Sequence, residues 1–266
     1  MRLATVTTLR GTSAAVETDD GWRALPAPDL SALLARGGAW QPGEVLAEAT
    51  PTLPLPRPGK VICCGLNYGD HIAETGRDMP AYPTLFAKHA DTLLADGQDI
   101  RLPAGLQVDW EAELAVVVGR ELRRASEDEA RAAVAGYTVA NDISVRDWQR
   151  RTPQWFQGKN WDATTPLGPV VVTPDEADPQ AGLDVLCRVN GVERQRGSTR
   201  TLVFPSAALL AYASTFTVLR PGDIVLTGTP GGVGMGMTPP LYLRDGDVVE
   251  TEIPGIGTLT NTLRLA

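Results

Sequence analysis

Two glutamates stand two residues apart at the start of an apolar run, in the stretch Asp109-Trp-Glu-Ala-Glu-Leu-Ala-Val-Val-Val118. Side chains two apart share one face of a strand at a separation of roughly 7 Å, so Glu111 and Glu113 can reach a single cation. On a solvated strand face such a pair would need no ligand. Trp110 and the valines instead predict burial, where carboxylates repel one another and lose solvation unless a proton or a metal ion neutralises them. We therefore predict that Glu111 and Glu113 bind a metal, with Asp109 joining or supporting them.

A third acidic group, Asp142, ends a later apolar run, in Ala140-Asn-Asp-Ile-Ser-Val-Arg-Asp147. An Asn-Asp pair is equally typical of an ordinary turn, so these residues alone leave both interpretations open. Together with Glu111 and Glu113, Asp142 would complete a site of three carboxylates. Ligands that are all oxygen atoms favour Mg²⁺ or Mn²⁺ over zinc.

The chain has two histidines, and one of them, His71, lies three residues before Glu74. This spacing places both on one face of a helical turn, where a His–Glu pair is a candidate general base. An incidental ion pair on an exposed helix is the alternative. Lys159 follows Gly158 in a predicted loop, where the glycine allows a close approach of backbone to ligand, although lone surface lysines are common.

Strands must position these groups, because strand signals dominate the chain. Runs bounded by Gly and Pro predict strands at Lys60 to Cys64, Asp109 to Val118, Tyr137 to Asp142, Pro169 to Thr173, Asp184 to Val189, Asp223 to Thr227, Asp247 to Ile253 and Thr258 to Leu265. The predicted helices are Asp29 to Ala35, Ser126 to Ala135, which starts with a Ser126–Glu129 capping box, and a segment from near Pro205 to near Thr215. This pattern predicts an α+β, mainly β chain, a mixed β-roll or β-sandwich with few short helices, and not a doubly wound α/β sheet.

The N-terminal part is expected to form a separate unit. It contains short alternating stretches, and Pro51 to Pro58 then holds four prolines in eight residues. Each proline ring fixes φ and removes a backbone donor, so this segment must run extended. We predict a small β-rich module with a Pro-rich linker at residues 1–57, and a catalytic domain at residues 58–266.

Composition excludes several partners. The net charge is -8 and there is no basic cluster, which disfavours nucleic-acid binding. No apolar run reaches the length of a membrane span and Met1 to Gly11 lacks a signal-peptide core, so we expect a cytoplasmic protein without membrane contact. Cys63, Cys64 and Cys187 show no metal-type spacing and are interpreted as reduced core residues.

Gly231-Gly-Val-Gly-Met-Gly236 superficially looks like a dinucleotide-binding loop. Such a loop needs a following helix within a βαβ unit, whereas Pro239-Pro240 follow here. We therefore expect no bound nucleotide and interpret the segment as a flexible loop next to the ligand.

Taken in order, these segments resemble the fumarylacetoacetate hydrolase family over about residues 59 to 266. The matching motifs are Asn67-Tyr68-x-x-His71-x-x-Glu74, Asp109-x-Glu111-x-Glu113-Leu114, Asn141-Asp142-x-Ser144-x-Arg146-Asp147, Gly158-Lys159, Asn190-Gly191 and Leu226-Thr227-Gly228-Thr229-Pro230. Each motif is short, but their shared order and spacing are specific. The chain is most similar to the short branch of acylpyruvases and oxaloacetate decarboxylases, some of which carry a small N-terminal module.

The resemblance implies the family's mixed β-roll, a homodimer, and Mg²⁺ or Mn²⁺ held by the trio already identified. It implies catalytic roles for His71, Glu74 and Lys159, with the His–Glu pair on a lid that orders over the substrate. The substrate-binding residues that it implies are Lys88, Arg146, Gln149 and Thr229. His89 receives no role.

These roles imply hydrolysis of the C–C bond of a 2,4-dioxo acid, of the acylpyruvate or fumarylpyruvate type, through a metal-bound pyruvate enolate. His71 and Glu74 would activate water, and Lys159 would stabilise the enolate. Two alternatives use a similar intermediate: decarboxylation of oxaloacetate or a related 2-oxo diacid, and isomerisation or hydration of a 2-oxo-ene-dioate in aromatic catabolism. A non-catalytic binding module is disfavoured because the set of site residues is complete.

Overall fold

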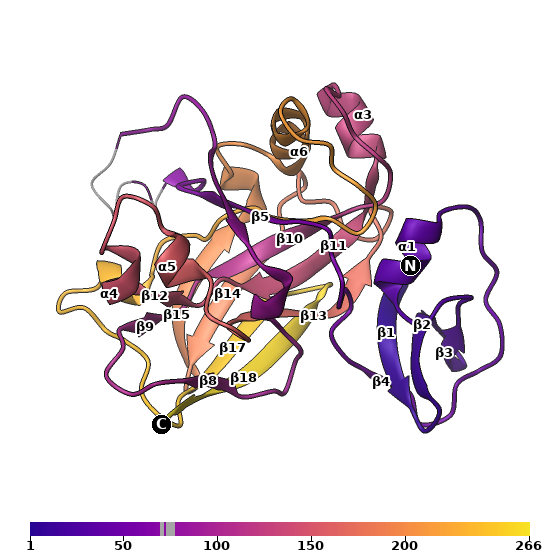
Figure 1. The fold of residues 1–266 in the computed structure, drawn as a ribbon, viewed down its shortest axis with the longest axis horizontal. Helices are drawn as coiled ribbons and strands as arrows, with labels where there is room; N and C mark the ends of the chain where they lie inside the picture. Colours follow the sequence, from indigo (N-terminus) through magenta and orange to yellow (C-terminus); the bar gives the residue numbers. More distant parts are fainter. Residues whose placement is uncertain (70–71, 73–77) are drawn as a thin grey trace.

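The computed structural model describes residues 1–69, 72 and 78–266, and strands outnumber helices in this part of the chain (Figure 1). The N-terminal strands are β1 (Arg2–Thr8), β2 (Gly11–Thr18), β3 (Gly21–Ala24) and β4 (Thr50–Pro51). They are followed by β5 (Val61–Gly65), β6 (Thr84–Lys88), β7 (Leu93–Leu94), β8 (Ile100–Leu102), β9 (Val108–Asp109), β10 (Ala112–Val118), β11 (Val134–Asn141), β12 (Ser144–Val145), β13 (Thr165–Val172), β14 (Asp184–Val189), β15 (Val192–Ser198), β16 (Ile224–Leu226), β17 (Val248–Ile253) and β18 (Gly257–Leu265). The α-helices are α1 (Leu30–Arg36), α3 (Glu127–Ala132), α4 (Arg146–Gln149), α5 (Phe156–Lys159) and α6 (Ser206–Ser214). The prediction of a mainly β chain with few short helices is confirmed.

The strands form one large mixed sheet and one smaller sheet. The large sheet runs β3-β2-β1-β13-β11-β10-β16-β5-β6, with β4 on β1 and β7 on β13. The smaller sheet runs β15-β14-β17-β18-β8, and β9 pairs separately with β12. Strand β5 pairs in parallel with β16, whereas β10 and β11 pair in antiparallel orientation. Around β10 and β11 the two sheets lie against each other (Figure 1).

Strand β10 is buried along its whole length, which explains its continuous apolar sequence. Leu114 and Val116 belong to the core shared with the smaller sheet, whereas Ala115 and Val117 belong to a second core with residues of β5 and β13. Successive side chains point to opposite faces of a strand, so Glu113 lies on the same face as Ala115 and Val117. Glu113 therefore projects from a fully buried strand of the large sheet, and Glu111 lies just before this strand begins.

The eight predicted strand segments all contain a strand, and the differences lie at their ends. The segment Asp109 to Val118 is two strands, β9 and β10, interrupted at Trp110 and Glu111. The helix α3 has the predicted capping box at Ser126 and Glu129 but ends at Ala132, because the β-branched Val134 already begins β11. Strands β6, β7, β8, β12 and β15 were not predicted. The sequence of β15 is largely polar and lacks apolar alternation.

The N-terminal strands β1 to β4 form one end of the large sheet. β1 pairs with β13 at Arg2–Val172 and Leu3–Val171, and Asp29 caps α1 by accepting a hydrogen bond from the Ala32 N–H at 2.8 Å. The division into an N-terminal module and a catalytic domain at residues 57 and 58 stays a prediction.

Among the described residues no helix is long and apolar enough to span a lipid bilayer.

Candidate active site

The register of β10 and β11 brings the three predicted metal ligands together. Glu113 pairs with Ala140 and Ala112 pairs with Asn141. One step further, the Asp142 N–H donates to the Glu111 carbonyl at 2.9 Å, so Asp142 lies directly across from Glu111. Opposite residues in an antiparallel pair have Cβ atoms about 5 Å apart. Glu113, two residues along the same face, completes a triangle.

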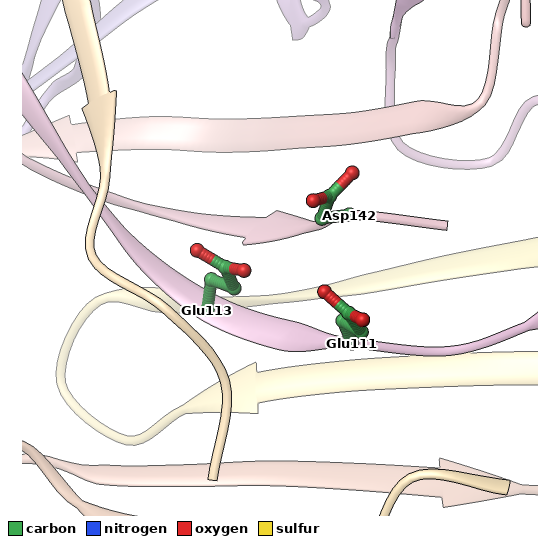
Figure 2. A group of neighbouring side chains, drawn as sticks. All are labelled: Glu111, Glu113 and Asp142. Carbon is green, nitrogen blue, oxygen red and sulfur yellow. The ribbon is translucent and has the colours of Figure 1, made fainter. Parts of the chain in front are cut away.

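The three carboxylates point toward one another from these neighbouring segments (Figure 2). One oxygen from each of Glu111, Glu113 and Asp142 lies within 4.8 Å of the others, and all three residues are buried. Each pair of oxygens is therefore close enough to share a cation whose metal–oxygen bonds are about 2.0–2.6 Å long. The convergence predicted from the sequence is present.

Two buried lysines lie against this trio. Lys159 Nζ donates to Glu111 Oε2 at 2.7 Å and to Asp142 Oδ2 at 2.8 Å. Lys88 Nζ donates to the other Asp142 oxygen. Burial alone would lower the pKa of Lys159, but the neighbouring Asp142 and Glu111 carboxylates outweigh burial and raise it. Lys159 is therefore an ammonium group at neutral pH.

Close packing of α5 against α4 and β6 positions Lys159. This segment is a short helix and not the loop expected from its glycine. A Cβ atom on Gly158 would lie 2.4 Å from the Cβ of Gln149, so only glycine allows the two helices to approach this closely. The Asn160 side chain accepts from the His89 N–H at 2.7 Å and donates to the Ala87 carbonyl at 3.0 Å. These bonds connect the end of α5 to the end of β6.

Asp109 supports the site and is not part of the trio. Its Oδ2 accepts from Arg146 Nε at 2.8 Å and from the Met235 N–H at 3.0 Å, and its Oδ1 accepts from the Gly234 N–H at 2.7 Å. A Cβ atom on Gly234 would lie 1.9 Å from the Leu241 carbonyl oxygen. The glycine-rich segment 231–236 thus serves tight packing against Asp109, in contrast to the flexible loop we expected.

Arg146 links Asp109 to the trio. Its Nη1 contacts Glu111 Oε1 at 2.7 Å and donates to Gln149 Oε1 at 2.9 Å. Its Nη2 is buried and has no hydrogen-bond partner among the described residues. Since a buried guanidinium donor without an acceptor is costly, Nη2 marks a position where a ligand oxygen is expected.

The charges leave room for a divalent cation. Four buried carboxylates, those of the trio and Asp109, face three buried cations, Lys88, Arg146 and Lys159. Glu113 is the member of the trio without an ion pair to any described residue, and its Oε2 accepts from the Gly228 N–H at 2.7 Å. Burial, then repulsion from Asp142 and Glu111, raises the pKa of Glu113 well above its usual value. A metal ion would replace that proton, so the residues present fit Mg²⁺ or Mn²⁺.

A cavity of about 770 Å³ opens beside the trio, within the roughly 300–1,000 Å³ typical of small-ligand sites. The predicted site residues in its wall are Glu111, Glu113, Arg146, Gln149, Lys159 and Thr229. Phe86 and Trp155 add an aromatic pair with ring centroids 5.5 Å apart, and Arg150 also lines the cavity. Asp142 and Lys88 do not line this cavity and form an ion pair with each other.

His71 and Glu74 lie outside the described residues, so their proposed catalytic roles stay predictions.

No role was predicted from the sequence for Gln195. Its Oε1 accepts from the Ala112 N–H at 2.9 Å, and its Nε2 donates to Thr229 Oγ1 at 2.7 Å, which connects β15 to the cavity wall. No sequence signal marks it, because a single glutamine in a polar strand is typical of a surface. Arg150 and Trp155 also line the cavity and were not predicted to do so. Trp155 could have been suggested as a ligand contact, because it is an aromatic residue in a loop that contains Pro153.

Comparison with known proteins gives concordant results. The family profile described as Fumarylacetoacetate (FAA) hydrolase C-terminal matches residues 60–264. Oxaloacetate tautomerase fahd2, mitochondrial, from Xenopus laevis is 45% identical over 211 residues, covering 78% of this chain and 66% of that protein. Oxaloacetate tautomerase FAHD2A, mitochondrial, from Homo sapiens is 44% identical over 218 residues, covering 81% of this chain and 69% of that protein. About a third of each relative therefore lies outside the match.

Solved structures agree over the whole chain. The fumarylacetoacetate hydrolase from Exiguobacterium antarcticum is 33% identical with a TM-score of 0.89, and the match covers 100% of both chains. The 5-carboxymethyl-2-hydroxymuconate delta-isomerase from Mycobacterium smegmatis is 33% identical with a TM-score of 0.86 and the same coverage. The family match, the fold and the buried acidic trio agree with the resemblance of the sequence. The chain is an enzyme of the fumarylacetoacetate hydrolase family.

Proposed function

We propose that this enzyme moves a proton between C3 and the C2 oxygen of a 2-oxo diacid of the oxaloacetate type, interconverting its keto and enol forms with the help of Mg²⁺ or Mn²⁺. The observation that carries the proposal is the contact of the Lys159 ammonium with Glu111 and Asp142, beside Arg146 Nη2, which has no hydrogen-bond partner in the described part of the chain. A cation site and a carboxylate-binding donor thus lie close together at one cavity.

Charge supports an anionic substrate. Four ionised carboxylates and three protein cations leave one net negative charge among the buried groups. A divalent ion held by Glu111, Glu113 and Asp142 would change this to one net positive charge. When bound, such an ion supplies Lewis acidity toward the oxygens of a 2-oxo acid. Arg146 Nη2 would donate to a substrate carboxylate, and Arg150 gives the cavity a further cation for a second carboxylate.

Lys159 has an electrostatic role in this proposal. Its raised pKa keeps the ammonium protonated, so it does not take a proton from C3. It instead stabilises the negative charge that develops on the C2 oxygen as the proton leaves, as a preorganised cation at a buried position does. On sequence grounds alone, we keep His71 and Glu74 as the groups that move the proton.

The relatives favour this reaction over the hydrolysis that we first expected. Two are named oxaloacetate tautomerases, and a solved structure of the same fold is named an isomerase. Keto–enol interconversion and isomerisation need a proton shuttle but no attacking water. Decarboxylation of the same diacid is the second candidate, because loss of carbon dioxide gives the same type of enolate.

The test is to add oxaloacetate to the enzyme with Mg²⁺ or Mn²⁺ and to follow enol absorbance and pyruvate in parallel. We expect faster loss of the enol signal without matching pyruvate formation. Lys159→Met should abolish the acceleration, whereas Lys60→Met, at a lysine paired with Asp223 outside the cavity wall, should retain it. Pyruvate formed in step with the signal would establish decarboxylation, and cleavage of acetylpyruvate without an effect on oxaloacetate would restore hydrolysis.

A further inference from the structure

A second cavity of about 450 Å³ shares no lining residue with the first. Its wall combines Arg131 at the end of α3, Tyr137 on β11, Arg200, and Pro205 to Ala207 at the start of α6. Its volume suits a small metabolite. None of these residues takes part in the site described above.

The start of α6 presents backbone donors to this cavity. The helix is nine residues long, from Ser206 to Ser214, and its N-cap, Pro205, makes no side-chain capping bond. The first N–H groups of a helix have no carbonyl partner inside it and carry the positive end of the helix dipole. The described residues provide no acceptor for the amides of Ser206 and Ala207. An anion is the ligand that such a helix end prefers.

The Ser206 hydroxyl is an independent sign of a ligand. Ser206 lines the cavity, is 7% exposed, and its Oγ has no hydrogen-bond partner among the described residues. Buried hydroxyl groups in folded proteins nearly always find a partner. A ligand oxygen near the start of α6 would satisfy this hydroxyl together with the two amides.

The charged side chains around the cavity favour a negatively charged ligand. Arg131 forms no ion pair with any described residue, and Arg200 donates to the Ala181 carbonyl. One carboxylate, Asp178, also lines the cavity, where its Oδ1 accepts from the Gln180 N–H at 2.9 Å. Burial, then the nearby Asp178, raises the pKa of Tyr137 to about 12, so its phenol keeps a proton to donate. Two guanidinium groups thus face one carboxylate.

We propose that this cavity is a second ligand site for a small organic oxyanion, whose charged end is held by the Ser206 and Ala207 amides and the Ser206 hydroxyl. Arg131 and Arg200 balance its charge. A carboxylate and a phosphate share this chemistry, and the experiment distinguishes them. The ligand is separate from the 2-oxo acid of the first cavity, so the proposal does not depend on the reaction catalysed there.

The test is a thermal-shift titration with sodium phosphate and, separately, sodium malonate, in EDTA and at constant ionic strength set with sodium chloride. Ser206→Asp places a carboxylate at the start of α6, so this variant should melt higher than wild type and respond to neither probe. Ser206→Ala keeps the helix start and removes only the hydroxyl, so it should bind more weakly. Arg131→Gln should weaken binding about two- to fivefold, as expected for a partly exposed ion pair. Arg123→Gln, at an exposed arginine outside the cavity, should bind as wild type does.

A saturable rise in melting temperature with either probe, lost in Ser206→Asp, supports the proposal, and the probe that acts identifies phosphate or carboxylate as the preferred group. A wild-type response no larger than that to chloride would overturn it. Equal responses of wild type, Ser206→Ala and Arg131→Gln would place binding elsewhere and would also overturn it. Lys159→Met must leave the response unchanged, which separates this site from the first cavity.

Discussion

Replacing Glu113 with glutamine tests the electrostatic account of the trio. Glutamine keeps the shape and the acceptor for the Gly228 N–H but removes the charge that burial, Asp142 and Glu111 disfavour. Because the folded-state pKa of Glu113 is raised, the folded protein holds this proton more tightly than the unfolded chain does. The corresponding stability is fully present below the ordinary carboxyl pKa and is lost as pH rises through the folded-state value. Without metal, Glu113→Gln should therefore be at least as stable as wild type at pH 8.

The same substitution should abolish stabilisation by metal. At a concentration 100 times its dissociation constant, Mn²⁺ or Mg²⁺ would stabilise the wild type by about 2.7 kcal/mol. For a chain of this size that is a rise in melting temperature of roughly 5–10 °C. Because a proton on Glu113 competes with the metal, the rise should grow with pH. Glu121→Gln, at an exposed glutamate, is the matched control and should retain the full rise.

Differential scanning fluorimetry of the three proteins, with EDTA and with Mn²⁺ from pH 5 to pH 9, measures both effects. A wild-type metal response in Glu113→Gln would refute this role of Glu113. A free energy of unfolding without metal that is lower than that of wild type by more than about 2 kcal/mol, a cost typical of a lost buried hydrogen-bonded charge, would also refute it. In that case the Glu113 carboxylate would stabilise the fold and would not serve as a metal ligand.

Further substitutions test other parts of the site. Lys159→Met should lower kcat on the order of 100- to 1,000-fold, as does loss of one preorganised oxyanion donor, while Mn²⁺ binding measured by calorimetry persists. Asp109→Asn should lower the free energy of unfolding in urea by about 3 kcal/mol, because it leaves the buried Arg146 with one charged partner fewer. His71→Ala should slow the keto–enol reaction and spare the Mn²⁺-induced rise in melting temperature; unchanged kinetics would remove His71 from the mechanism. Burial, with Glu113 nearby, raises the pKa of Cys64 to about 12, so the folded enzyme should not react with a disulfide reagent at pH 8 although Cys64 lines the cavity.

The convergence of Glu111, Glu113 and Asp142 is predictable from the sequence because strand geometry is local. A period of two places Glu111 and Glu113 on one face, and the strand ending at Asp142 needs only the antiparallel register to bring its carboxylate alongside. The eight strand segments are equally readable because each carries apolar residues bounded by turns. The family resemblance adds the lysine, arginine, glutamine and threonine of the cavity wall.

Contacts between segments far apart in sequence were not predictable in the same way. Asp109 has the same alternation as the two glutamates, yet the break at Trp110 turns it toward Arg146 and segment 231–236. Gln195 holds Thr229 of the cavity wall from β15, whose polar sequence is typical of an exposed strand. The glycines of segment 231–236 look like a flexible loop, and only the carbonyls packed against them show that they are required for close approach. These features depend on tertiary packing, for which sequence periodicity carries no signal.

Two further expectations remain predictions. The homodimer was implied by the resemblance alone, and light scattering of the purified enzyme would test it. The cytoplasmic location is likewise untested, and the relatives compared above carry the word mitochondrial in their names.

Anomalous diffraction from crystals grown with Mn²⁺ tests the central claim most directly. A single peak bonded to oxygens of Glu111, Glu113 and Asp142, each at about 2.0–2.4 Å, is the expected result. Crystals that diffract well but show no peak between these carboxylates at millimolar Mn²⁺, or show the ion bound elsewhere in the cavity, would contradict the account.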